Sequence, residues 1–487
     1  MPQPPYFEPL AAADATFLYW EKPEAPLHIG GVYIFEGRSQ VPGRRGALGI
    51  AQTIEERLHL VPRYRQKVQW LPLNLGHPVW VDDADFDLSF HVRRAALPSP
   101  GDEAALRDYA ARVMSRPLDL GKPLWEMTVV EGLEGGRVAL IHKVHHAMVD
   151  GISTIDIATL MLDADPEGYL PEAGGSWRPR PAPDDLELLV DAVWQRSPLQ
   201  HARLLGQARL GGLLDLARPL GTGMLALGQS LLRPRPGLFF NQQIGLHRRI
   251  HHLALPLDLF KEVKNALGGT VNDVVLAMVA GGLRRWLRAR REPVPESVRI
   301  LCPVSVRDQS QRYRLGNRVS GMMVELPLGD LAPAGRLERV QETTGDLKRS
   351  RQAVAAQTLV QLADWSPATL QALAGRLLPA DQQWLVNFIV TNVPGPQIPF
   401  YSGGAQLLEV WPFVPIYPSV GLGVALVSYI GKVHFGLVAD RDLVPDLEAF
   451  GRHLERAARE LQRAARAATG SARAPAAGRR AAGRRRD

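Results

Sequence analysis

The spacing of apolar residues along residues 1–175 alternates between periods of about two and about 3.6 residues. The run at 27–35 (LHIGGVYIF) predicts a strand, whereas residues 48–61 and 104–118 carry apolar side chains at helical spacing. Residues 136–144 (GRVALIHKV) form a short apolar run after a Gly-Gly turn. A helical pattern follows this run, so this part of the chain mixes strands and helices.

The same mixture of strand-like and helix-like spacing of apolar residues returns from residue 241 onward. Thr270 is followed three positions later by Asp273 and by an apolar helical face, which is a capping-box pattern. A closing helix is predicted over 444–466. Strands are predicted over residues 298–307, 317–328, 385–396, 421–430 and 432–440.

The composition changes between these two parts. Residues 174–187 (GGSWRPRPAPDDLE) are rich in Gly, Pro and Arg, which is typical of a link between units. The stretch 186–236 is rich in Leu, carries scattered arginines and is interrupted by Gly and Pro. We interpret it as two or three amphipathic helices, which fit packing onto the protein and contact with a membrane surface equally well.

The length of the chain argues against a single core. The chain has 487 residues, whereas domains usually contain about 100–200. We therefore expect an α/β (α+β) fold of two packed halves, residues 1–175 and 241–465, joined by a linker over 176–240. Residues 466–487 lack apolar periodicity and are expected to form a disordered, arginine-rich tail.

The net positive charge of the chain is concentrated at the C-terminus. The net charge is +7, but residues 470–487 hold six arginines and one acid, a contribution of +5 that leaves +2 for the rest. A nearly neutral body argues against a nucleic-acid-binding surface, so we expect no nucleic acid partner. For the tail, a solvated segment is a simpler interpretation than contact with anionic lipid.

The single cysteine, Cys302, excludes an internal disulfide, and its strand-like surroundings favour a buried filler over a nucleophile. Three early prolines and the lack of a basic region argue against a signal peptide. No window approaches about 18 consecutive apolar residues, so no transmembrane helix is predicted. We expect a cytoplasmic protein, with peripheral attachment to the inner membrane or lipid bodies left open.

The segment most suited to chemistry is HHAMVDG, residues 145–151. If His145 and His146 end the preceding strand, their side chains point to opposite faces, so only one can face a substrate. A neutral imidazole can take a proton from a hydroxyl or thiol there, because its unperturbed pKa is about 6.5. Asp150, followed by Gly151, is suited to fixing the loop by an ion pair or backbone hydrogen bonds.

Two other interpretations of this segment compete. Adjacent histidines cannot easily bind one ion together, and zinc signatures space their ligands by several residues, so no metal site is expected. The structural alternative is that both histidines are satisfied strand-end residues and that Asp150 caps the next helix. A second pair, His251 and His252, lacks the Asp-Gly that follows the first pair.

HHAMVDG matches the His-His-x-x-x-Asp-Gly signature of CoA-dependent acyltransferases of the chloramphenicol-acetyltransferase-like superfamily and of nonribosomal-peptide condensation domains. Over nearly its whole length the chain resembles the bacterial wax ester synthase/diacylglycerol acyltransferase family, with the tail from about residue 466 outside the likeness. The supporting stretches, in the family's order, are 14–37, 116–127, 145–151, 270–277, 302–307, 316–327 and 387–396.

The resemblance implies two chloramphenicol-acetyltransferase-like halves with an active-site tunnel at their interface. It makes His146 the general base and gives His145 a part in shaping the site. It also makes Asp150 structural and pairs it with an arginine, for which Arg307 and Arg249 are both candidates.

Two further stretches match family motifs. Pro123, Leu124 and Trp125 match the Pro-Leu-Trp stretch, thought to line the acyl or alcohol path, although apolar packing explains them equally well. Asn272 and Asp273 match the Asn-Asp motif, where the capping box favours a helix-start role over direct catalysis. Such a helix start can still aim backbone N–H groups at an oxyanion or a CoA phosphate.

The implied function is transfer of a long-chain acyl group from acyl-CoA to diacylglycerol, to a long-chain alcohol or to both, without an acyl-enzyme. Acyl-CoA is a substrate, so no cofactor is expected. Two alternatives stay open. One is a condensation-type enzyme that needs a carrier-protein partner, and the other is a non-catalytic lipid-body scaffold, which leaves the His motif unexplained.

Overall fold

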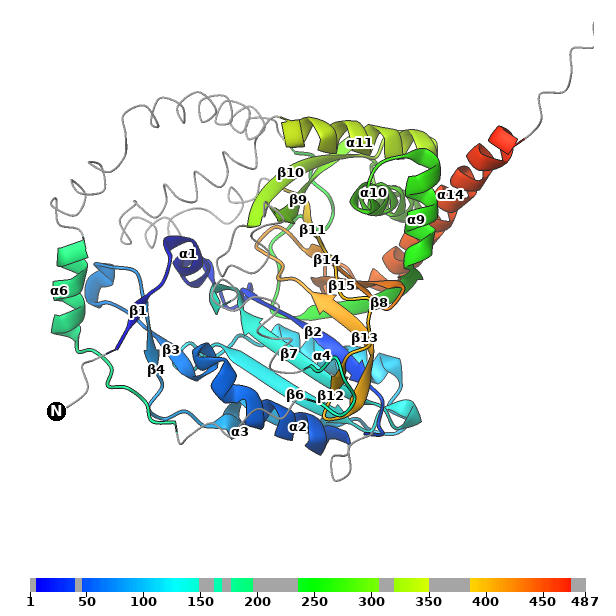
Figure 1. Ribbon diagram of the computed structural model, residues 1–487. Helices are drawn as coiled ribbons and strands as arrows, with labels where there is room; N and C mark the ends of the chain where they lie inside the picture. The colour runs from blue at the N-terminus through cyan, green and yellow to red at the C-terminus, as the bar shows by residue number, and fades with distance from the viewer. Residues whose placement is uncertain are drawn as a thin grey trace, which may run out of the picture.

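The structure is a computed structural model that describes residues 6–39, 46–148, 162–168, 177–195, 235–305, 319–349 and 386–473. Two six-stranded sheets form its two halves (Figure 1). Helices accompany both sheets, so the mixed α/β architecture of two halves that the sequence predicts is confirmed.

The first sheet consists, in spatial order, of β12 (Tyr401–Ser402), β13 (Ala405–Phe413), β2 (His28–Phe35), β7 (Val138–His145), β6 (Trp125–Glu131) and β5 (Val92–Ala96). Helices α2 (Gly46–Arg57) and α4 (Glu103–Ser115) cover it. Successive β7 side chains alternate between two cores, since Leu140 packs with α2 residues and Ile141 with α4 residues. A strand buried on both faces needs a continuous apolar sequence, which explains the run that ends at the His-His segment.

Smaller elements complete the first half. A three-stranded sheet lies beside the first sheet, and short helices flank both. These elements are β1 (Glu8–Pro9), β4 (Val79–Asp82), β3 (Gln66–Gln69), α1 (Ala12–Trp20), α3 (Leu88–His91) and α6 (Asp185–Gln195).

The second sheet consists, in spatial order, of β10 (Val319–Pro327), β9 (Ser297–Ser305), β11 (Phe388–Val393), β14 (Leu422–Tyr429), β15 (Lys432–Asp440) and β8 (Arg248–Pro256). Helices α9 (Leu257–Leu267), α10 (Val271–Ala289), α11 (Pro333–Arg349) and α14 (Leu447–Arg473) gather on one side of it (Figure 1). Thr270 and Asp273 form the predicted capping box at the start of α10. Most of α10 is buried, as its apolar sequence indicates.

Two strands cross between the halves, the short β12 and the longer β13. β13 follows β11 in the chain, yet it pairs antiparallel with β2 in the first sheet, where Phe413 lies opposite Gly30. The sequence did not indicate this strand, because its apolar alternation is broken by Glu409 and Pro412. Its register shifts between Leu407 and Glu409, which is a bulge that disturbs the period of two.

The C-terminal boundary expected from the sequence needs a correction. The disordered tail was expected from residue 466, but α14 continues to Arg473. The helix extends because alanines and arginines with high helix propensity follow residue 466. The rest of the tail, residues 196–234 of the linker and the helix expected after the His motif lie outside the described residues.

In the part of the chain that the structure describes, no single helix is long and apolar enough to cross a membrane. Among the described helices, one pair, α9 and α10, reaches the required length and composition when taken together, and the two are bent by 100° relative to one another.

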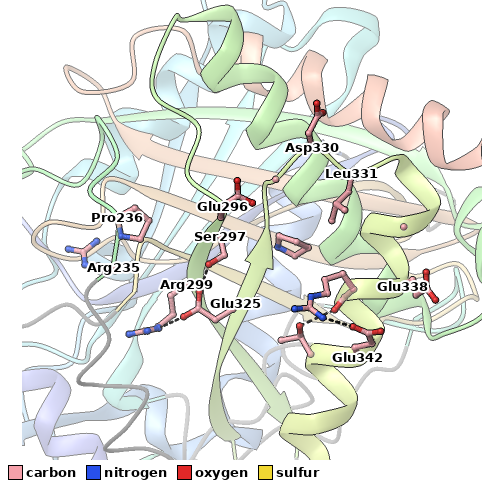
Figure 2. A pocket seen from close by; sticks show the side chains of 15 residues that line it. Arg235, Pro236, Glu296, Ser297, Arg299, Glu325, Asp330, Leu331, Glu338 and Glu342 are labelled. Carbon is pink, nitrogen blue, oxygen red and sulfur yellow. Dashed lines mark hydrogen bonds and ion pairs between the residues drawn. The ribbon is translucent and has the colours of Figure 1, made fainter.

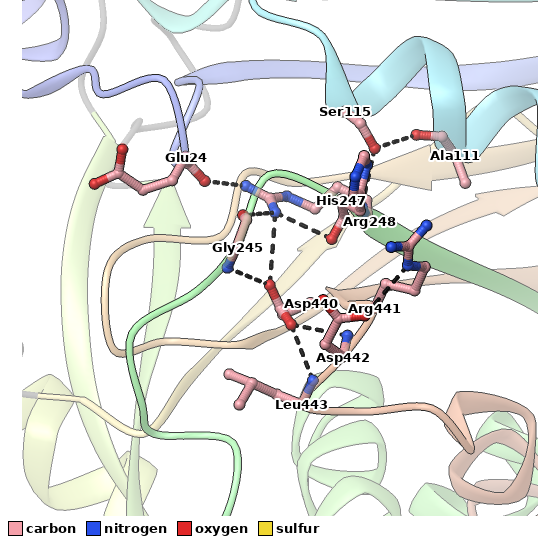
Figure 3. A network of polar contacts seen from close by, with 10 residues as sticks. All are labelled: Glu24, Ala111, Ser115, Gly245, His247, Arg248, Asp440, Arg441, Asp442 and Leu443. Carbon is pink, nitrogen blue, oxygen red and sulfur yellow. Dashed lines mark hydrogen bonds and ion pairs between the residues drawn. The ribbon is translucent and has the colours of Figure 1, made fainter.

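A buried arginine joins the two halves (Figure 3). The guanidinium of Arg248, at the start of β8, donates to the carbonyl oxygens of Glu24 and Gly245 and lies 4.0 Å from the carboxylate of Asp440. Its backbone N–H donates to Ser115 Oγ at the end of α4. Burial lowers the pKa of Arg248 to about 10, and Asp440 opposes this shift, so the side chain stays charged near neutral pH.

This network generates a stability prediction. Arg248→Gln removes a buried charge from its partners and should lower the free energy of unfolding by about 3 kcal/mol, because Asp440 is left without its counter-charge. Urea denaturation followed by circular dichroism measures this. Arg441→Gln is the matched control, since its half-exposed side chain pairs with the exposed Asp442 and should change stability by less than about 0.5 kcal/mol. Equal midpoints for the two variants would contradict the role given to Arg248.

Candidate active site

The His-His pair lies where β7 ends. His145 is the last residue of the strand and His146 begins a 3-10 turn, His146–Met148. Backbone hydrogen bonds fix both residues, since the His145 N–H donates to Leu124 O at 2.9 Å and the His146 N–H donates to Leu27 O at 2.8 Å. His145 is fully buried, whereas His146 is half-buried. The two histidines therefore differ in exposure, because the turn after His145 ends the alternation of the strand.

The surroundings of His145 define its tautomer. Its Nδ1 accepts a hydrogen bond from the Ala147 N–H at 3.1 Å, so the ring proton of the neutral form belongs on Nε2. That Nε2 lies 3.5 Å from a carboxylate oxygen of Glu21, whose other oxygen accepts from the Leu27 N–H at 3.1 Å. Glu21 thus links the His145 ring to the segment that holds the backbone of His146.

The His146 ring is stacked on Phe17 of α1, with the ring centroids 3.9 Å apart and the planes inclined by 20°. Its Nδ1 is buried and has no hydrogen-bond partner among the described residues. Burial, with a smaller effect from His145, lowers the pKa of His146 to about 4. The ring is therefore neutral near pH 7 and able to accept a proton.

The Pro-Leu-Trp stretch lies in the core of the first half. Pro123 is buried, and both Leu124 and Trp125 are fully buried. The Trp125 indole N–H donates to Tyr64 O at 2.8 Å, and its ring stacks on His91. These contacts show the packing role that the sequence left open, while Leu124 also contributes the carbonyl that holds His145.

Asn272 and Asp273 lie in the second half, at the start of α10. Asp273 completes the capping box with one carboxylate oxygen and accepts from Thr344 Oγ1 at 2.8 Å with the other. Asn272 accepts a hydrogen bond from the side chain of Asn392, at the end of β11. Asp273 therefore acts at the helix start, which agrees with the structural interpretation of the motif.

Asn272 lines an apolar cavity of about 590 Å³ between α9, α10, β10 and the ends of β11 and β14. Burial raises the pKa of the Cys302 thiol, also in its wall, to about 11, so that the thiol is not a nucleophile. The volume suits a small-molecule ligand. The apolar residues in its wall are Leu257, Val271, Leu276, Met322, Val324, Pro394 and Val433.

A larger cavity, of about 780 Å³, differs in chemistry (Figure 2). Its charged groups are partly paired with one another, since Arg299 bonds Glu325 at 2.8 Å and Arg339 bonds Glu342 at 2.8 Å. Glu296 and other carboxylates also line it. Five acidic and three basic side chains make it unsuited to a hydrocarbon chain or an anion.

The structure describes only some of the other residues that the sequence predicts for the site. Asp150, Gly151 and Arg307 lie outside the described residues, so the structural role of Asp150 stays a prediction. Arg249, one of its two candidate partners, lies 3.7 Å from Glu448 of α14. No hydrogen bond or ion pair among the described residues joins the histidine pair to Asn272 or its neighbours.

Three contributors to the site were not assigned from the sequence: Glu21, Leu27 and Phe17. All three lie within residues 14–37, a stretch that resembles the acyltransferase family. The likeness indicated the stretch but gave no role to its residues. Their role depends on a long-range contact with the end of β7, which no local pattern reveals.

The chain matches the family model described as the wax ester synthase/diacylglycerol acyltransferase catalytic domain over residues 10–275. The WS/DGAT C-terminal domain matches residues 315–462. The chain therefore belongs to the wax ester synthase/diacylglycerol acyltransferase family, and it is an acyltransferase.

Individual relatives agree with this assignment. A Mycobacterium tuberculosis protein named as a probable diacylglycerol O-acyltransferase, tgs2, is 34% identical over 453 residues, which cover 91% of this chain and 96% of that protein. Another from the same organism, tgs1, is 33% identical and covers 92% and 94%.

Solved structures support the fold. The wax ester synthase/diacylglycerol acyltransferase from Marinobacter aquaeolei VT8 superposes with a TM-score of 0.65 at 28% identity, covering 94% of this chain and 99% of that one. The first condensation domain of the calcium-dependent antibiotic synthetase gives a TM-score of 0.58 at 17% identity, covering 94% and 96%, which shows a shared fold alone.

The contact between Glu21 and His145 generates a second prediction. Glu21→Gln keeps an acceptor for the Leu27 N–H but removes the charge facing His145 Nε2. We expect kcat for CoA release to fall about tenfold with little change in KM, because a charge-assisted contact that orients the ring contributes about 1.4 kcal/mol. Lys22→Gln, on the same loop, is the control. Wild-type kcat in Glu21→Gln would show that the carboxylate does not position the site.

Proposed function

We propose that this protein transfers a long-chain acyl group from acyl-CoA to the hydroxyl of diacylglycerol or of a long-chain alcohol, with His146 as general base. The observation that carries the proposal is the half-buried His146, whose backbone N–H is held by Leu27 O and whose ring stacks on Phe17 and is kept neutral by burial. A base must be unprotonated to act, and this ring meets that requirement across the physiological range.

The reaction proceeds in one transfer step. His146 takes the hydroxyl proton while the acceptor oxygen attacks the thioester carbonyl, which gives a tetrahedral oxyanion. The oxyanion collapses, the carbon–sulfur bond breaks, and protonated His146 returns its proton to the departing CoA sulfur. The alkoxide is the poorer leaving group of the two, so assistance at the alcohol matters most. No step requires a metal, a cofactor or an acyl-enzyme.

The apolar cavity beside Asn272 is the proposed place for a hydrocarbon chain of one substrate. Its wall is made mainly of aliphatic side chains, and each methylene buried there contributes about 0.8 kcal/mol. The backbone N–H groups at the start of α10 lie near Asn272 and favour a negatively charged group at that end. This combination suits a substrate with a long apolar chain and a polar reacting end.

The names of the relatives support diacylglycerol and a long-chain alcohol as the proposed acceptors. The Mycobacterium tuberculosis relatives are named for diacylglycerol, and the Marinobacter enzyme is named for wax ester and diacylglycerol together. Both acceptors are nearly insoluble in water. We propose that the enzyme works in the cytoplasm and meets these acceptors at the surface of the inner membrane or of lipid bodies.

Removal of the base gives the first prediction for this reaction. His146→Ala should lower CoA-thiol release from palmitoyl-CoA, with dioleoylglycerol or hexadecanol as acceptor, by about 10²–10⁴-fold. His145→Ala is the paired variant, and we expect a smaller loss, because His145 shapes the site and does not contact the acceptor. Full activity in His146→Ala together with loss in His145→Ala would assign the base to the other histidine.

The next prediction concerns a substitution that narrows the apolar cavity beside Asn272. Val271→Phe adds a ring to the wall of the apolar cavity at a partly exposed position, so the fold should tolerate it. We expect kcat/KM to fall more for long chains than for short ones when the length of either the acyl group or the alcohol is varied. Val294→Phe, partly buried outside this cavity, is the control. Equal losses at every chain length would exclude the cavity as a hydrocarbon site.

A further inference from the structure

The second half contains a further cavity, whose lining includes neither the histidine pair nor Asn272. It has a volume of about 440 Å³ and lies between the C-terminal part of α10, the start of α11 and α14, helices that gather together in Figure 1. Arginine dominates its lining. The five arginines are Arg284, Arg285, Arg288, Arg336 and Arg463.

The positive charge of this arginine cavity exceeds its negative charge. Only two acidic side chains, Asp330 and Glu460, line it, so that five arginines leave a net charge of +3 with His453 neutral. His453 has a lowered pKa, caused first by burial and then by nearby arginines, of which Arg285 lies in the cavity wall. The positively charged arginine side chains repel one another when no further anion is bound.

The two carboxylates are already engaged. Asp330 pairs closely with Arg284, and Glu460 pairs closely with Arg285. Arg288 lies 3.8 Å from Asp330, and Arg463 lies 3.9 Å from Glu460, so each of these arginines shares a carboxylate that is bonded elsewhere. Both retain donors for another ligand.

Arg336 is the most informative member. Its residue is only 6% exposed, and one terminal nitrogen donates to Leu331 O at 3.0 Å. Its Nε is buried and has no hydrogen-bond partner, and no ion pair joins it to another described residue. Burying an arginine without a counter-charge costs several kcal/mol. An anion in the cavity would offset that cost.

The start of α11 adds to the positive potential. The helix runs over 17 residues from Pro333, and its first turn lines the cavity together with Arg336. The helix dipole favours an anion near this end. The first-turn residues in the wall offer no free N–H group, because Pro333 has none and the Arg336 N–H donates to Ala332 O at 2.9 Å. The buried Arg336 side chain at this helix end therefore carries the argument for an anion.

We propose that the arginine cavity binds a phosphate-bearing ligand. Guanidinium groups match phosphate oxygens through paired hydrogen bonds, and the cavity volume accommodates a phosphoester group. Two sources supply this chemistry, namely the phosphates of CoA and the headgroup of an anionic glycerophospholipid. The CoA source rests on the proposed function, whereas the lipid source does not.

The arginine cavity is separate from the apolar one. Asn272 and Arg285 are both on α10, 13 positions apart, which places them about 20 Å from one another along the helix axis. A ligand in the arginine cavity therefore acts at a distance from the reacting end of the substrate.

The test uses the full-length protein and a double variant, Arg288→Gln/Arg463→Gln. Both side chains are more than half exposed, so the fold should not depend on them. Arg459→Gln, equally exposed on α14 but outside the cavity, is the charge control. Binding of CoA is measured by calorimetry, and binding to phosphatidylcholine vesicles with and without phosphatidic acid is measured by sedimentation.

We expect the double variant to bind at least one of these probes about tenfold more weakly for each arginine removed, while Arg459→Gln binds as the wild type does. Loss of CoA binding, with a raised KM for palmitoyl-CoA, identifies CoA as the source. Loss of binding only to vesicles that contain phosphatidic acid identifies the lipid headgroup. The proposal is overturned if the wild type binds neither probe or if the double variant and Arg459→Gln weaken binding equally. The calorimetry and sedimentation results are obtained without turnover, so they do not depend on acyl transfer.

Discussion

The site depends on the loop from Glu21 to Leu27, which holds both histidines at the end of β7. Leu27 fixes the backbone of His146, and Glu21 faces the ring of His145. The loop is itself held from the other half of the molecule, because Arg248 donates to the carbonyl of Glu24. The loop that holds the base is therefore also fixed from the second half of the molecule.

Burial decides the chemistry of the histidine pair. Removing an imidazole from water disfavours its charged form, and no carboxylate faces His146 among the described residues to reverse that effect. Because its pKa falls from 6.5 to about 4 on folding, the native state favours the neutral ring. Its contribution to stability is present above about pH 6.5 and is lost as the pH falls toward 4. Desolvation of the His146 ring thus has two consequences. It lowers stability in acid, and it keeps the ring unprotonated, and so able to act as a base, at neutral pH. At His145 the Glu21 carboxylate faces the ring, which suits a residue that orients the site.

The sequence predicted the architecture where patterns are local. The capping box at Thr270, the strand before His145 and the closing helix from Leu447 follow from residue spacing, and the structure confirms them. The family likeness predicted an acyltransferase, which the comparisons confirm. Features that depend on distant contacts did not follow: β13 joins the first sheet across the halves, and Glu21 reaches His145 through the folded loop. The extra turns of α14 were missed because an arginine- and alanine-rich segment fits a helix and a solvated tail alike.

The claim that His146 is held neutral as the base is tested most directly by its own titration. The measurement is an NMR titration of the histidine side chains in the full-length protein, with the His146 signal assigned by its loss in His146→Gln. We predict that the ring stays neutral down to about pH 5 and titrates with a pKa near 4. A midpoint at or above 6.5 would contradict the claim, because burial would then not control the charge of the base.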